Sequence, residues 1–192
     1  MFSHSVQYHH IIIFGVCDAV LGLVIGDECT SSLFFEVTIK EFEMIYKKYN
    51  IDDCRMIIEL EGILDSIVYI YSISVEYPFY RTLVYGVSQT ICAFIEKLLR
   101  KVFMNTCDIE LLDFLESQGT LGTLLASDEI KNILGVHLVN IITYEMSYLQ
   151  NQEDGIRKDI GMNWRNRLIH ISGINISLAV HLFNILVIIF IN

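Results

Sequence analysis

The chain has 192 residues, which is long enough for one domain with a hydrophobic core. Its formal net charge is −10, 53% of its residues are hydrophobic, and its mean hydropathy is +0.48. This charge excludes a broad basic surface for nucleic acid, and the hydropathy is below that of a polytopic membrane protein. The five cysteines are far apart and odd in number, which indicates reduced, mostly buried thiols in a cytoplasm rather than disulfides or a zinc site. The histidines form no metal-ligand cluster either, so we predict no metal and no cofactor.

Residues 1–75 are expected to form an N-terminal helical elaboration. Within it, residues 11–25 are short apolar runs that fit a buried strand pair or a helix equally well. A helix is predicted from about Ser32 to Tyr49. A turn at residues 50–53 then caps a second helix that ends near residue 74.

Residues 76–192 are expected to form a second helical unit. Residues 79–104 are the clearest amphipathic helix, because apolar side chains recur there every three or four positions. Ser127 is predicted to cap a helix that ends near Leu149. A polar loop is expected at residues 150–159. The fold class is therefore predicted to be all-α, a bundle of five or six helices.

The C-terminal segment, residues 174–191, is long and apolar enough to raise the question of a membrane anchor. Ser177, His181 and Asn184 fall at i, i+4 and i+7, so a single polar stripe runs along it. Such a stripe is more typical of a core helix with one wet or interfacial edge than of a lipid-facing span. A tail-anchored membrane protein, with basic residues 157–167 at the membrane surface, stays as an alternative.

The most informative segment carries the motif Arg165-Asn166-x-x-x-His170. On a helix Asn166 and His170 share one face, and Arg165 lies about 100° away. An arginine that clamps an anion, an amide, and a group that titrates near neutrality suit the cleavage of a phosphodiester. Residues 157–170 also hold four basic side chains against Asp159 alone, a local excess of +3. If RNA binds this acidic protein, we expect it to bind there.

Residues 161–170 read G-x-N-x-R-N-x-x-x-H, which is similar to the C-terminal domain of a family of unknown function within the HEPN superfamily. Glu96-x-x-x-Arg100 in an earlier helix also fits this superfamily of small helical domains. The resemblance covers about residues 80–190. The chain departs from the family at Trp164, where Leu is usual, and at Ile171, where the family has Gly directly after the histidine.

The resemblance implies an all-helical HEPN-like domain and a metal-independent endoribonuclease, of the kind found in defence or toxin systems. Such enzymes act as homodimers whose two motifs face each other across one cleft. His170 would move a proton between the ribose 2′-hydroxyl and the leaving 5′-oxygen, while Arg165 holds the scissile phosphate and Asn166 orients the histidine or the phosphate. Supporting contacts to the substrate would come from Asn163, Arg167 and Lys158. The implied partners are RNA, a second copy of the chain and, in a toxin setting, a neutralising protein.

Another interpretation is a non-catalytic HEPN-like module that binds RNA, nucleotide or a protein through the same cleft. Glu96 and Arg100 are expected to be a solvated i, i+4 pair. His137 and His181 are interpreted as core or interface histidines, although His181 is also a candidate for a second acid or base. The tyrosines at 69, 71, 77 and 80 are expected to pack in the core or at an interface.

Overall fold

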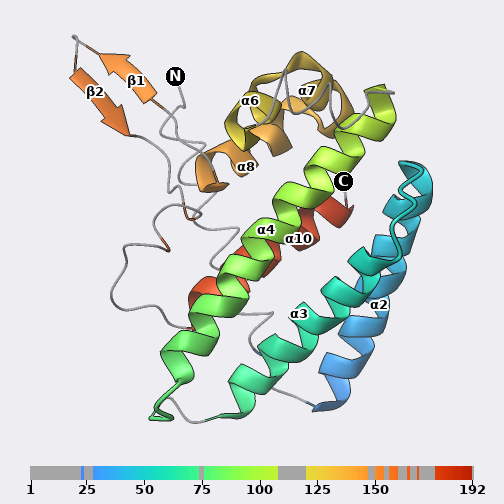
Figure 1. Ribbon diagram of the computed structural model, residues 1–192, viewed down its shortest axis with the longest axis vertical. Helices are drawn as coiled ribbons and strands as arrows, with labels where there is room; N and C mark the ends of the chain where they lie inside the picture. The colour runs from blue at the N-terminus through green and yellow to red at the C-terminus, as the bar shows by residue number, and fades with distance from the viewer. Residues whose placement is uncertain are drawn as a thin grey trace.

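The computed structural model describes the chain at residues 23, 28–73, 76–107, 120–146, 150–153, 156–159, 164, 168 and 176–191. Within these residues the protein is an all-α bundle with one short β-hairpin (Figure 1), which confirms the predicted fold class. The helices are α2 (Glu28–Lys48), α3 (Arg55–Ser72), α4 (Tyr80–Cys107), α6 (Leu121–Ala126), α7 (Asp128–Leu134), α8 (Val136–Met146) and α10 (Ile176–Ile191).

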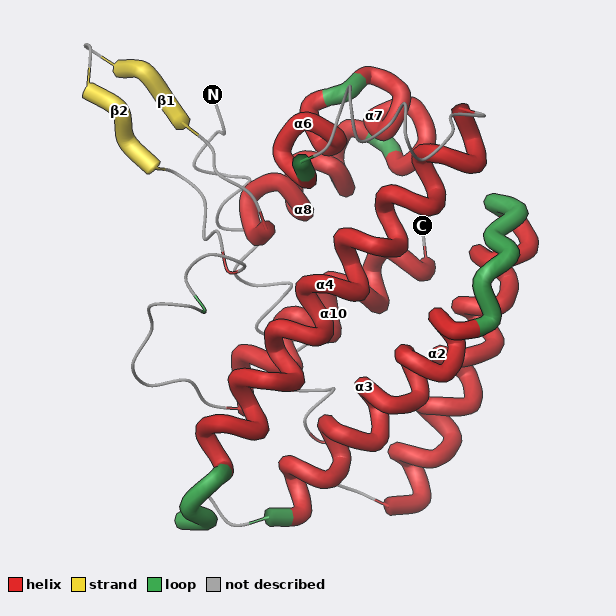
Figure 2. Tube along the Cα trace, viewed as in Figure 1, coloured by secondary structure: helices red, strands yellow, loops and turns green. Residues whose placement is uncertain are grey.

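The long helix α4 runs through the middle of the bundle, as the tube in Figure 2 shows. Helix α10 lies along one side of α4, α3 and α2 form a second layer, and the short helices α6, α7 and α8 cluster near one end of α4. Side chains from α2, α3, α4 and α10 meet in a single core, in which Phe42, Ile67, Leu98 and Phe183 are all fully buried. Residues on both sides of position 75 therefore contribute to the same core.

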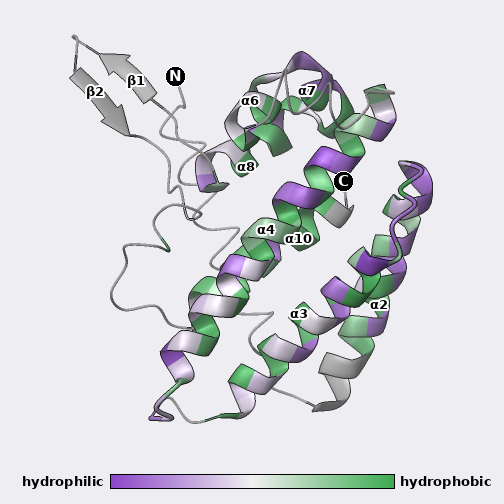
Figure 3. Cartoon of the chain, in the orientation of Figure 1, coloured by the Kyte–Doolittle hydropathy of each residue, from purple (hydrophilic) through white to green (hydrophobic). Residues whose placement is uncertain are grey.

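The apolar pattern of each helix explains its place in the bundle. Figure 3 shows polar and apolar residues alternating along α3 and α4, each of which turns one apolar stripe inward. Helix α10 is apolar nearly throughout, and its Ala179, Leu182, Phe183 and Leu186 are fully buried. Each large apolar side chain buried in this way contributes about 1.5–3 kcal/mol to folding.

The polar stripe of α10 is exposed at its first residue and runs from there into the core. Ser177 is exposed and His181 is half-buried, but Asn184 is only 6% exposed. The expected wet edge is therefore wrong at Asn184, because this residue lies within 182–186, where every residue is buried. No helix in the described ranges has both the length and the apolar character needed to cross a membrane.

The turn between α2 and α3 differs in detail from the predicted cap. Asn50 adopts a left-handed φ of 49°, and its carbonyl accepts a bond of 2.7 Å from Asn105 Nδ2 on α4. The N-cap of α3 is Cys54, whose side chain makes no capping bond. Asp53 faces α4 instead, where its Oδ2 lies 3.9 Å from Lys97 Nζ and 3.8 Å from Lys101 Nζ. An interhelix ion pair has replaced the predicted local cap.

The helix predicted from Ser127 to about Leu149 is divided into α7 and α8, and with α6 before them the described residues contain seven helices. Ser127 caps α7 as predicted, since its hydroxyl accepts a 3.2 Å bond from the N–H of Ile130. The helix ends at Leu134 because Gly135 has a φ of 81°, which side chains with a Cβ rarely adopt. Helix α6, which the prediction did not contain, is capped by Thr120 through a 3.2 Å bond from Thr123 N–H.

The predicted polar loop at 150–159 contains an antiparallel hairpin of β1 (Gln150–Glu153) and β2 (Ile156–Asp159). Figure 1 draws it apart from the helices. Asp-Gly at 154–155 is the sequence signal for a two-residue hairpin turn, so the loop prediction overlooked a local pattern. Nearly all of the ambiguous segment 11–25, and the question of a helix continuing through Gly173, lie outside the described residues.

The thiols and tyrosines only partly follow the prediction of burial. Cys92 is buried and Cys107 is half-buried, but Cys54 is exposed. Burial raises the pKa of the Cys107 thiol, with a smaller contribution from the nearby charge of Glu129. Tyr80 is buried and Tyr71 is half-buried, whereas the tyrosines at 69 and 77 are largely exposed. For the two exposed tyrosines the expected core position is wrong, and the interface role stays a prediction.

We predict that Gly135→Ala lowers the free energy of unfolding by about 1–3 kcal/mol, because alanine is strained at this positive φ. Gly62→Ala is the matched control: Gly62 lies in the middle of α3, and a Cβ there meets no atom within 4 Å. That variant should gain stability, because alanine has the higher helix propensity. Urea unfolding followed by circular dichroism measures both. Equal stability of the two variants would contradict the role assigned to Gly135.

Candidate functional site

The structure describes the residues that flank and hold the predicted motif. Arg165, Asn166 and His170 lie outside the described residues, as do Asn163 and Arg167. Lys158 lies on β2, where its backbone is opposite Asn151 of β1. Trp164 and Leu168, which belong to the same segment, are described and show where that segment meets the bundle.

Trp164 and Leu168 attach the motif segment to the core. The backbone N–H of Leu168 donates a 2.9 Å hydrogen bond to the carbonyl of Trp164, which is the i to i+4 bond of a helical turn. Leu168 is 1% exposed, and Trp164 is half-buried and packed against the core. Because residues four apart share a helix face, these two side chains define the inward face of the segment.

The indole of Trp164 is hydrogen-bonded to a buried carboxylate. Its Nε1–H donates a 2.8 Å bond to Oε2 of Glu145, the residue before the last of α8. His181 Nε2, from α10, lies 3.1 Å from the same oxygen. The rings of Trp164 and His181 meet edge to face at 6.3 Å between centroids. Three segments far apart in the sequence thus converge on one oxygen atom of Glu145.

The burial of Glu145 makes these bonds energetically important. The residue is 1% exposed, and moving a carboxylate out of water costs several kcal/mol unless donors compensate it. Trp164 and His181 supply such donors, with the imidazole nitrogen either neutral and protonated at Nε2 or charged. His181, whose side chain is 17% exposed, is therefore the satisfied histidine that was predicted. His137 is exposed, so it is not a core residue, and its interface role stays a prediction.

Glu145 did not stand out in the sequence as a functional residue. Its spacing from the apolar residues of α8 could have identified it as buried. Glu145 comes three residues after Ile142 and seven after Leu138, both of which are buried. It therefore occupies an apolar stripe. An acidic residue in such a stripe either needs a partner or marks the edge of the stripe, and the sequence contains no local partner for it.

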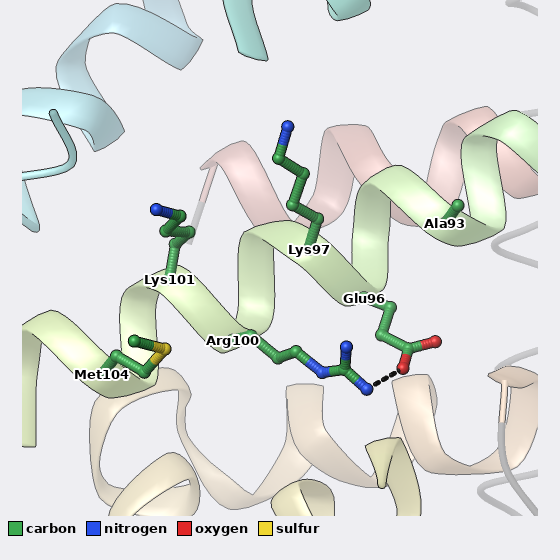
Figure 4. Close-up of a pocket in the computed structure, with 6 residues that line it drawn as sticks. All are labelled: Ala93, Glu96, Lys97, Arg100, Lys101 and Met104. Carbon is green, nitrogen blue, oxygen red and sulfur yellow. Dashed lines mark hydrogen bonds and ion pairs between the residues drawn. The ribbon is translucent and has the colours of Figure 1, made fainter. Parts of the chain in front are cut away.

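The pair formed by Glu96 and Arg100 is an ion pair within α4, but it is not solvated as predicted. The Glu96 side chain is 10% exposed and that of Arg100 is 30% exposed. Figure 4 shows both on one side of α4, with Lys97 and Lys101 on the other. Glu96 lies four residues after Cys92, within the buried face of the helix, so its neighbours exclude water.

A cleft of about 360 Å³ runs along α4 beside this pair (Figure 4). Its lining residues are Ala93, Glu96, Lys97, Arg100, Lys101 and Met104. Each basic group there lies near a carboxylate: Arg100 pairs with Glu96, Lys97 is 2.8 Å from Glu59 Oε1, and Lys101 lies near Asp53. These nearby carboxylates weaken the attraction of the three basic groups for an anion.

Among the residues that the structure describes, no three His, Cys, Asp or Glu side chains are grouped so as to hold a metal ion. Comparison of the chain with models of protein families, with curated proteins and with solved structures gave no match.

We predict that Glu96→Ala lowers the free energy of unfolding by about 1–3 kcal/mol, because it leaves the Arg100 guanidinium partly buried without its carboxylate. Glu36→Ala is the matched control, since Glu36 and Lys40 form an i, i+4 pair on α2 with both side chains more than half exposed. The exposed pair is screened by water, so this variant should unfold within error of the wild type. Chemical unfolding compares them, and equal losses would show that burial of the α4 pair contributes nothing.

Proposed function

We propose that this chain is a metal-independent endoribonuclease of the HEPN type that works as a homodimer. The observation that supports the proposal best is the anchoring of the motif segment by Trp164 and Leu168. These two positions point into the bundle immediately before and within the R-N-x-x-x-H string. They determine which positions of a helical motif are left to face a substrate.

Helical spacing from these anchors predicts the direction of the reactive side chains. Asn166 follows Trp164 by two residues and His170 follows Leu168 by two residues, a rotation of about 200° in each case. Both are therefore expected on the face opposite the core, and Arg165 on the flank about 100° from Trp164. A substrate phosphate would then reach the arginine, the amide and the imidazole from one side.

The chemistry assigned to these residues needs no metal. One His170 imidazole would take the proton of the ribose 2′-hydroxyl as this oxygen attacks the phosphorus. The 5′-oxygen leaves with a proton from a second imidazole, and a 2′,3′-cyclic phosphate remains on the other product. Arg165 would neutralise the charge that develops on the phosphate oxygens, and Asn166 would orient the imidazole or the phosphate. Further contacts to the RNA would come from Asn163, Arg167 and Lys158.

The need for a second imidazole supports the homodimer. Each chain supplies one His170, and His181 is already bonded to Glu145 and lies against the indole of Trp164. The second His170 would therefore come from a partner copy across the cleft. The charge distribution suits this arrangement, because the local basic excess at 157–170 would confine RNA to the motif in a protein of net charge −10.

The tail-anchored alternative has less support. Helix α10 is 16 residues long, and its middle is buried against α4, α2 and α3. In this arrangement the apolar side chains of residues 182–186 are covered by protein. A role in defence, in which an accompanying protein neutralises the ribonuclease, is a further part of the proposal.

We expect purified wild-type protein to cleave a mixed RNA substrate in EDTA, leaving 2′,3′-cyclic phosphate ends. His170→Ala should slow cleavage by at least about 100-fold, since it removes the general acid and base. His137→Ala is the matched control, because His137 is exposed on α8 and outside the motif, and it should cleave at the wild-type rate. Absence of cleavage by folded wild-type protein would overturn the proposal. RNA binding that survives His170→Ala but not Arg165→Ala would then assign a binding module.

Light scattering on the eluate of a sizing column tests the dimer. The expected mass is twice the 22.1 kDa of one chain. A protein that cleaves RNA but stays monomeric at the concentration of the cleavage assay would contradict the shared site and require a second acid or base within one chain.

A further inference from the structure

We infer that Glu145 is a positioning residue, which holds the R-N-x-x-x-H segment in place for cleavage through its contacts with Trp164 and His181. The inference rests on the proposed function and adds a residue to it from outside the motif. Glu145 lies on α8, 19 residues before Trp164 and 36 before His181 in the chain. It is therefore tertiary structure, and not the local sequence of the motif, that brings this carboxylate to the segment.

The geometry makes Glu145 the point where the motif segment is attached to two helices. Its Oε2 accepts the Trp164 indole N–H at 2.8 Å and lies 3.1 Å from His181 Nε2, so one atom links α8, the motif segment and α10. Trp164 directly precedes Arg165 in the chain. A shift of the indole would be passed through one peptide unit to the backbone of the proposed phosphate-binding residue, because consecutive Cα atoms are held about 3.8 Å apart.

The burial of Glu145 indicates a requirement beyond filling space. The other buried residues of α8 are apolar and pack without the desolvation cost of a charged group: Leu138, Val139, Ile142 and Met146. A hydrogen bond also has a direction, which apolar packing lacks, so the carboxylate restricts the rotation of both rings about their own bonds. Placement within about 1 Å is what catalytic groups need, since a misplacement of that size lowers rates by about 100-fold.

The single tryptophan of the chain makes the anchor directly measurable. Full-length protein labelled with nitrogen-15 has one indole N–H resonance, and its chemical shift and exchange with water report the bond to Glu145. We expect Glu145→Leu to move this resonance and speed its exchange. The same variant should lower kcat for RNA cleavage by about 10–100-fold, with KM changed by less than about threefold.

Glu145→Gln is the conservative variant, because the amide oxygen of glutamine can still accept the indole N–H. Its indole chemical shift and its kcat should both be close to those of the wild type. Glu96→Gln is the matched control at another buried carboxylate, which pairs with Arg100 on α4. It should leave both the indole resonance and kcat at wild-type values. An unmoved indole resonance in folded Glu145→Leu, or a moved one with kcat unchanged, would overturn the inference.

Trp164→Phe covers the case in which Glu145→Leu does not fold. It removes the indole donor and keeps the carboxylate with its bond to His181, so kcat should fall by the same factor as for Glu145→Leu; an unchanged kcat would overturn the inference. If wild-type protein fails to cleave RNA, the proposed function fails and the effect on kcat falls with it. The indole resonance is measured without RNA, so it still tests whether Glu145 holds the indole of Trp164.

Discussion

The burial of α10 is the constraint on which the rest of the bundle depends. Its 16 residues, ISLAVHLFNILVIIFI, are apolar on nearly every face, so α10 is stable in water only where other helices surround it. Helices α4, α2 and α3 supply that surrounding with their apolar stripes, which explains why the N-terminal and C-terminal parts of the chain share one core. The two polar residues of α10 that reach inward, His181 and Asn184, must then find their place inside the protein.

Much of the fold follows from local patterns that the sequence displays. The apolar periodicity predicted α2, α3 and α4 to within a few residues, because apolar side chains that recur every three or four positions over such lengths line up only on a helix. The division at Gly135 was missed, since a glycine between two apolar helical stretches fits either a continuous helix or a break. The hairpin at 150–159 was missed because the sequences of its strands, QNQE and IRKD, are polar and do not alternate between apolar and polar residues.

The site was less predictable than the fold for a physical reason. From the sequence around it, Trp164 is expected only to pack in the core. Glu145 is a single acidic residue near the end of an apolar helix, and nothing beside it in the sequence indicates a partner. Their bond depends on how α8 lies against the motif segment, and no pattern within either segment specifies this. His181 was correctly expected to be a satisfied histidine, but its partner follows only from the tertiary structure.

The two buried carboxylates, Glu96 and Glu145, show how differently a charge can be accommodated. Glu96 is neutralised by Arg100 one turn away on the same helix, so its partner is present as soon as α4 forms. Glu145 gains Trp164 and His181 only when α8, the motif segment and α10 have come together. These two bonds, which help to compensate the desolvation of Glu145, therefore come from tertiary structure. The stability of that part of the bundle and the placement of the proposed catalytic residues therefore depend on the same contacts.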